Sequence, residues 1–178
     1  LPRGTGGPGG VGEATGIGDL RAWLRAGEGV VTEDVEVTSW RDQSGWKRDA
    51  HELEFDRRPD LVSGVGPRLA PAVRFDGRSH LLIPRPVEDD FTLVAVFAST
   101  SFTANFAWYL SPAIVGRGDR SGSCGRGQEY HLGINGQRPL FVVAGKELKG
   151  SGNYSDGRPH SMIASRLKSS GELNLFMD

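Results

Sequence analysis

Acidic and apolar residues alternate over Glu52-Leu-Glu-Phe-Asp56, which makes this stretch the candidate for acid–base chemistry. Successive side chains of a strand point to opposite faces, so Glu52, Glu54 and Asp56 would share one face of a strand. Glycoside hydrolysis needs a pair of carboxylates, one as the acid and one as the nucleophile or base. The alternative, which we favour, is the solvated face of an edge strand, where charge also discourages edge pairing.

Two tryptophans bracket the segment Trp40-Arg-Asp-Gln-Ser-Gly-Trp46, whose centre is rich in turn-forming residues. Asp42 and Ser44 have short side chains that bond to nearby backbone, and Gly45 suits a tight turn. We expect Trp40 to pack in the core. Trp46 either packs in the same way or offers its flat indole as a platform for the apolar face of a sugar.

A glycan site would combine an aromatic platform with planar polar groups. Residues of both kinds occur in segments that we expect to be loops or loop edges. The candidate ligand-binding residues are Trp46, Trp108, Tyr109, Arg126, Asn153 and Tyr154.

Calcium is the metal that acidic loops of this kind could bind, because it takes carboxylate and carbonyl oxygens as ligands. The possible donors are Asp76, Asp42 and Asp119. For Asp76 and Asp42 we favour a different role, in which each carboxylate bonds the backbone of its own turn.

The elements that must position these residues have the patterns of strands. Val73 and Phe75 alternate with Arg74, Asp76-Gly77 breaks the run, and 81–83 resumes it, which predicts a hairpin. The apolar run Phe91–Phe97 predicts a central strand that is buried on both faces.

The second half of the chain repeats this pattern. Further strands are expected over 113–116, 129–134, 139–143, 160–167 and 172–177, with a hairpin signal at Asn135-Gly136. Strands at this spacing and the lack of a convincing helix predict an all-β sandwich or barrel.

Composition narrows the range of functions. The chain has 178 residues and a formal net charge of -1, so it lacks the basic surplus typical of nucleic-acid binding. No apolar run approaches the roughly 20 residues that span a bilayer, and we expect no membrane span. Cys124 is the only cysteine, which excludes a disulfide within the chain. The Gly-rich residues 1–18 are expected to be a linker or tail, and the folded domain to occupy 19–178.

Four segments carry a resemblance to a known family. They are Trp23-Leu-Arg-Ala-Gly-Glu-Gly-Val30, Val37-Thr-Ser-Trp-Arg-Asp-Gln-Ser-Gly45, Arg58-Pro-Asp-Leu-Val62 and Ala72-Val-Arg-Phe-Asp-Gly77. In order and spacing they resemble the laminin-G-like, concanavalin A-like lectin/glucanase domain of bacterial extracellular proteins. The looser pattern over 91–97, 156–160 and 173–178 extends this resemblance to the end of the chain.

The resemblance implies a concanavalin A-like jelly-roll sandwich of two antiparallel sheets, in an extracellular or cell-surface protein. Such domains mostly bind glycans or proteins. Some relatives are glycanases with a Glu-x-Asp-x-Glu strand motif, and the acids at 52–56 have a different order. The family usually continues past the equivalent of Met177-Asp178, so we expect a second chain or a neighbouring subunit to supply the final strands.

Three functions follow from this interpretation of the sequence. The first is a non-catalytic recognition or adhesion module that binds a glycan or a protein. The second is a structural or assembly module of a larger particle, completed by a partner chain. The third is a glycoside hydrolase that uses Glu52 and Glu54.

Overall fold

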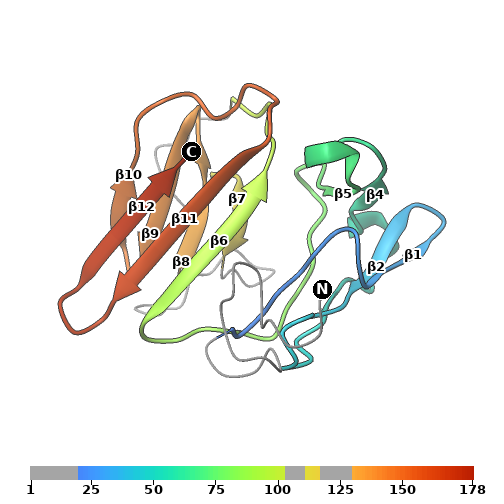
Figure 1. Cartoon of the computed structure of the whole chain (residues 1–178), viewed down its shortest axis with the longest axis horizontal. Helices are drawn as coiled ribbons and strands as arrows, with labels where there is room; N and C mark the ends of the chain where they lie inside the picture. Colours follow the sequence, from blue (N-terminus) through green and yellow to red (C-terminus); the bar gives the residue numbers. More distant parts are fainter. Residues whose placement is uncertain (1–19, 103–110, 117–129) are drawn as a thin grey trace. The chain divides into compact units, whose positions relative to one another are not determined.

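The computed structural model describes residues 20–102, 111–116 and 130–178 (Figure 1). The chain divides into two compact units, Leu1–Val87 and Glu88–Asp178, and each is treated by itself. The regular structure of the described residues is antiparallel β-sheet, with two short 3-10 turns at Phe55–Arg57 and Pro67–Leu69. This confirms the predicted all-β class. None of the described residues belongs to a helix long and apolar enough to cross a membrane.

The first unit is built on one antiparallel sheet. Its strands are β1 (Val30–Glu33), β2 (Glu36–Trp40), β3 (Ala50–His51), β4 (Asp60–Val62) and β5 (Ala72–Arg74). The order is β1-β2-β4-β5, and β3 pairs with the end of β2 where Ser39 faces His51. Val37 of β2 is fully buried, and its N–H donates to the Pro59 carbonyl at 2.7 Å. Strand β2 ends at Trp40, two residues before Asp42 and the turn that it organises.

The hairpin predicted around Asp76-Gly77 does not form. Residue Leu82 makes an isolated bridge with His51 instead of pairing with β5. The turn itself is present, because Asp76 Oδ1 accepts hydrogen bonds from the backbone N–H groups of Arg78 at 2.8 Å and Ser79 at 2.7 Å. The turn residues predict that the chain reverses but not which strand the returning segment pairs with. In the structure Leu82 pairs with His51 of β3.

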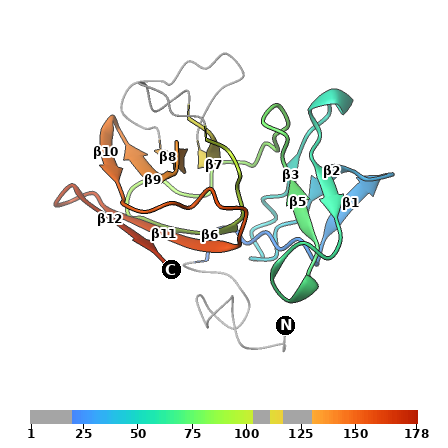
Figure 2. The same cartoon turned by 90° about the horizontal axis from the view of Figure 1, so that it is seen from above.

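The second unit is a sandwich of two sheets (Figures 1 and 2). One sheet has the order β12-β11-β6 and the other β10-β9-β8-β7. The strands are β6 (Phe91–Phe97), β7 (Ala113–Gly116), β8 (Tyr130–Asn135), β9 (Arg138–Val143), β10 (Lys146–Lys149), β11 (His160–Leu167) and β12 (Glu172–Met177). The Phe91 ring of β6 lies 5.5 Å from that of Tyr130 and 6.3 Å from that of Phe141, so aromatic contacts join the two sheets.

Strand β6 corrects the sequence prediction. It pairs with β11 alone in the described sheet, and only one of its faces is buried. Phe91 and Ala95 point into the sandwich, whereas Val94 and Val96 are exposed. The prediction failed because a continuous apolar run does not by itself distinguish a doubly covered strand from one with an apolar outer face.

The hairpin of β8 and β9 is confirmed, with Gly136 and Gln137 as its two-residue loop. Tyr130, Leu132 and Ile134 alternate along β8 and are buried, and the positions between them are buried too. His131 is one of them, and burial lowers its pKa to about 4, because the charged imidazolium is poorly solvated there. The structure therefore keeps a neutral histidine in the body of the sheet.

Candidate ligand-binding site

The turn that follows β2 is organised around the carboxylate of Asp42. Oδ1 accepts from the backbone N–H groups of Trp23 at 2.8 Å and Ser44 at 2.9 Å. Oδ2 accepts from the Ser44 hydroxyl at 2.7 Å and from the Arg48 backbone N–H at 3.0 Å. Burial alone raises the pKa of Asp42, but these hydrogen bonds outweigh it and hold the pKa below its ordinary value.

Trp46 projects from this turn. Its neighbours Gly45 and Lys47 both have positive φ, 96° and 54°. A lysine rarely adopts this left-handed conformation, so the surrounding hydrogen bonds must hold it there. Trp46 remains 38% exposed, which places it at the surface and not in the core.

Two arginines lie over the Trp46 ring. The guanidinium carbon of Arg21 is 4.7 Å from the ring centre, and that of Arg48 is 4.6 Å from it. Arg48 is held at both ends, since its backbone N–H donates to Asp42 and its Nη1 donates to the Arg21 carbonyl at 2.9 Å. We call Trp46, Arg21 and Arg48 the Trp46 patch.

The Trp46 patch brings two guanidinium groups to one aromatic ring. Within the ranges that the structure describes, neither Arg21 nor Arg48 forms an ion pair with a carboxylate. A second aromatic–arginine pair of the same unit differs in this respect. Arg58 lies 5.7 Å from the Phe55 ring, and its Nη1 is 2.8 Å from Glu33 Oε2. The Trp46 patch thus offers an aromatic surface with two positive charges.

The acidic stretch at 52–56 does not form a strand, which corrects the sequence expectation. Glu52 is 1% exposed, and its Oε1 accepts from the backbone N–H groups of Leu53 and Glu54. Its Oε2 lies 2.7 Å from His80 Nε2. Leu53, which alternation assigned to the interior, is 77% exposed. Local capping of the backbone by the carboxylate turns Glu52 inward and leaves the apolar neighbour outside.

Glu54 has a separate role from Glu52. Its Oε2 lies 3.0 Å from Arg57 Nε within the short 3-10 turn. The two glutamates therefore do not present a pair of carboxylates on a common strand face.

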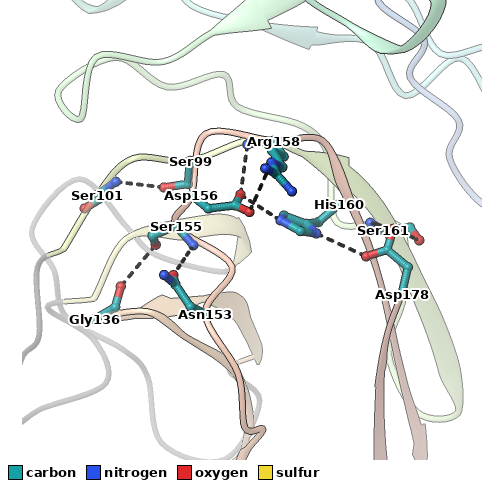
Figure 3. Close-up of polar contacts among 10 residues, drawn as sticks. All are labelled: Ser99, Ser101, Gly136, Asn153, Ser155, Asp156, Arg158, His160, Ser161 and Asp178. Carbon is teal, nitrogen blue, oxygen red and sulfur yellow. Dashed lines mark hydrogen bonds and ion pairs between the residues drawn. The ribbon is translucent and has the colours of Figure 1, made fainter.

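Asn153 and Tyr154 belong to the second unit, in the connection between β10 and β11. Asn153 Oδ1 accepts from the Ser155 N–H at 3.0 Å, and the buried Ser155 hydroxyl donates to the Gly136 carbonyl at 3.2 Å (Figure 3). The Tyr154 ring stands edge-on to the His160 ring, with centres 5.0 Å apart. These two predicted residues are adjacent in the chain, and the Tyr154 N–H donates to the Gln137 carbonyl at 2.9 Å, which with Ser155 holds the loop against the β8–β9 turn.

His160 is held between two carboxylates at the start of β11. Its Nε2 lies 2.9 Å from Asp156 Oδ1, and its Nδ1 lies 3.2 Å from Asp178 Oδ1 (Figure 3). The hydrogen bond with Asp156 raises the pKa of His160, burial opposes this, and Asp178 adds to the rise. Asp178 also accepts from the backbone N–H and hydroxyl of Ser161, so this cluster ties β11 to the end of β12.

Two of the donors proposed for calcium, Asp42 and Asp76, bond the backbone of their own turns, as the favoured alternative predicted. A carboxylate has about four lone-pair positions, and Asp42 already accepts four hydrogen bonds from its own turn. Asp76 Oδ1 is likewise used by its turn. Among the described residues, no group of three or more His, Cys, Asp or Glu side chains is placed to hold a metal ion. Asp119 lies outside the described residues, as do Trp108, Tyr109 and Arg126.

Sequence reasoning named Trp46 but missed the arginines beside it. Arg48 is two residues from Trp46, so its proximity to the ring could have been expected from the sequence. Arg21 lies 25 positions before Trp46, and no local pattern indicates their contact. It also missed the contact of the buried Glu52 with the partly exposed His80, which are 28 positions apart and carry no joint motif.

Comparisons with protein-family models, curated proteins and solved structures return no match for this chain.

Proposed function

We propose that this chain is a non-catalytic recognition module that binds a glycan, and that the Trp46 patch is where the glycan binds. The observation that carries the proposal is that Trp46 is 38% exposed on a turn held by the hydrogen bonds of Asp42. A flat indole covers the apolar face of a sugar ring, and adjacent guanidinium groups supply donors for hydroxyl oxygens. A turn held in one conformation loses little further entropy on binding.

The sequence resemblance sets the wider context of this proposal. It supports a laminin-G-like jelly roll in a secreted or cell-surface bacterial protein, with a role in adhesion. The glycanase alternative has less support, because Glu52 is buried against Leu53, Glu54 and His80. A hydrolase needs both carboxylates within reach of the scissile bond.

A second candidate function is assembly, and the outer face of the sheet β12-β11-β6 favours it. Val94, Ile163 and Phe176 stand opposite one another on the three strands, and all three are exposed. Exposed apolar rows of this kind are typical of protein contact surfaces. Light scattering on the chain and on the V94S/F176S variant tests this function: a particle larger than one chain that dissociates in the variant supports assembly.

A glycan array tests the main proposal with the wild-type chain, W46A and F55A. F55A is the matched control, because Phe55 is an exposed aromatic of the same unit whose arginine is neutralised by Glu33. Truncating an anchoring aromatic costs about 2 kcal/mol or more, so W46A should bind at least about 30-fold more weakly. Equal binding by W46A and the wild type, or no binding by the wild type, would contradict the proposal.

A further inference from the structure

We infer that the glycan bound at the Trp46 patch is acidic and that its carboxylate pairs with Arg21 and Arg48. This inference rests on the proposed function and narrows the class of ligand. It starts from the charge of the patch, where two guanidinium carbons lie 4.7 and 4.6 Å from one ring centre. Neither guanidinium pairs with a carboxylate among the described residues, so an acidic ligand would supply that partner.

Among the described arginines that lie over an aromatic ring, the two of the Trp46 patch differ from Arg58 in having no carboxylate partner. Arg25, Arg57 and Arg58 of the same unit each lie within 3.4 Å of a glutamate oxygen. Arg21 and Arg48 have no such partner within the described part of the chain, although they lie closer to their ring than Arg58 does to Phe55. The carboxylate of Asp42, at the base of the same turn, accepts hydrogen bonds from backbone N–H groups and from the Ser44 hydroxyl.

Arg48 is also pre-positioned. One of its five N–H donors is used by the Arg21 carbonyl at 2.9 Å, and the described residues supply no further hydrogen-bond partner for the guanidinium. A planar guanidinium matches a carboxylate in a two-point hydrogen bond, which is shorter and stronger than a bond between neutral groups. A uronic or sialic acid would bring its carboxylate to the two guanidinium groups, and its sugar ring would contact the part of Trp46 that remains exposed.

Binding measurements on matched ligands test the inference. The probes are oligosaccharides of galacturonic acid, glucuronic acid and sialic acid, each beside its methyl-esterified form, which has the same sugar without the charge. We expect at least one acid to bind about tenfold more tightly than its ester. Because the Debye length falls from about 10 Å at 0.1 M salt to about 3 Å at 1 M, added salt should weaken the acid and leave the ester unchanged.

Three variants locate the charge. R21Q and R48Q should each weaken binding of the acid about tenfold and leave binding of the ester unchanged. The affinity of R48K for the acid should lie between those of R48Q and the wild type, because lysine keeps the charge but lacks the planar pair of N–H donors. R78Q is the matched control, since it removes one positive charge from the exposed Asp76 turn. Thermal melts of each variant show whether the fold is intact.

The possible outcomes separate this inference from the proposed function. If acids and esters bind equally and binding depends on Trp46, the glycan proposal stands and the acidic ligand is wrong. If R78Q weakens binding as much as R48Q, net charge and not the patch is responsible, and the inference fails. If no glycan of either kind binds, both proposals fail.

Discussion

The Ser44 hydroxyl lies 2.7 Å from Asp42 Oδ2, and Ser44 itself is fully buried. This contact lies at the base of the turn that carries Trp46, so the exposed indole depends on a carboxylate that no ligand needs to touch. The stability of this turn and the proposed binding at Trp46 therefore both depend on Asp42.

Replacing Asp42 should loosen the turn. D42A removes the acceptor of four hydrogen bonds, and we expect a loss of about 2 kcal/mol in the free energy of unfolding, since partly exposed bonds count for less than buried ones. Urea denaturation measures it. D76A, which opens a fully exposed turn of the same kind, should cost less. Equal losses in the two variants would mean that the Asp42 turn has no special role.

Replacing Glu52 should destabilise the first unit. E52A leaves the N–H groups of Leu53 and Glu54 without their acceptor and removes the partner of His80, at a cost of about 2–4 kcal/mol. E52Q keeps an oxygen for the backbone and should lose less. Denaturation of both variants provides the measurement. An E52A chain as stable as the wild type would show that the buried carboxylate is not structural.

His131 should make the second unit sensitive to acid. Burial lowers its pKa in the folded chain from the ordinary value of 6.5 to about 4, so the unfolded chain binds more protons between these limits and stability falls as the pH drops. The loss is about 3 kcal/mol by pH 4. H131Q should lack this dependence when unfolding is followed across the range. A wild-type chain whose stability is flat between pH 6.5 and 4 would refute the assignment.

His160 should act in the opposite direction. Its pKa is raised on folding, so its stabilising effect is complete below about pH 6.5 and is lost as the pH rises through the folded value. Hydrogen bonds from the Arg158 and Ser161 backbone N–H groups lower the pKa values of Asp156 and Asp178, respectively. The stability that these two carboxylates contribute is therefore lost as the pH falls below 3.8. The difference in unfolding free energy between wild type and H160Q should therefore be largest between these limits. A difference that grows above pH 8 would contradict the cluster.

Local patterns in the sequence predicted much of the second unit. The hairpin of β8 and β9 and the strands β11 and β12 follow from alternation and turn residues alone. The exposed row of Val94, Ile163 and Phe176 could not be predicted, because an apolar outer face has the same composition as a buried one.

The first unit was harder to predict, since its key contacts are capping interactions and not strand periodicity. Glu52 bonds the backbone directly after it, which reverses the burial that alternation assigns to Glu52 and Leu53. Arg21 meets Trp46 where the Trp23 N–H donates to Asp42, a contact between residues 19 positions apart that holds the two segments together. No local pattern reports a contact of that kind.

The most direct test of the glycan site is fluorine NMR on the chain labelled with 5-fluorotryptophan. The resonance absent from W46F belongs to Trp46, and titration with the best ligand of the array then follows that ring alone. We predict that the Trp46 resonance shifts saturably with the ligand, while those of Trp23 and Trp40 change less. A ligand that binds and leaves the Trp46 resonance in place would contradict a glycan site at this ring.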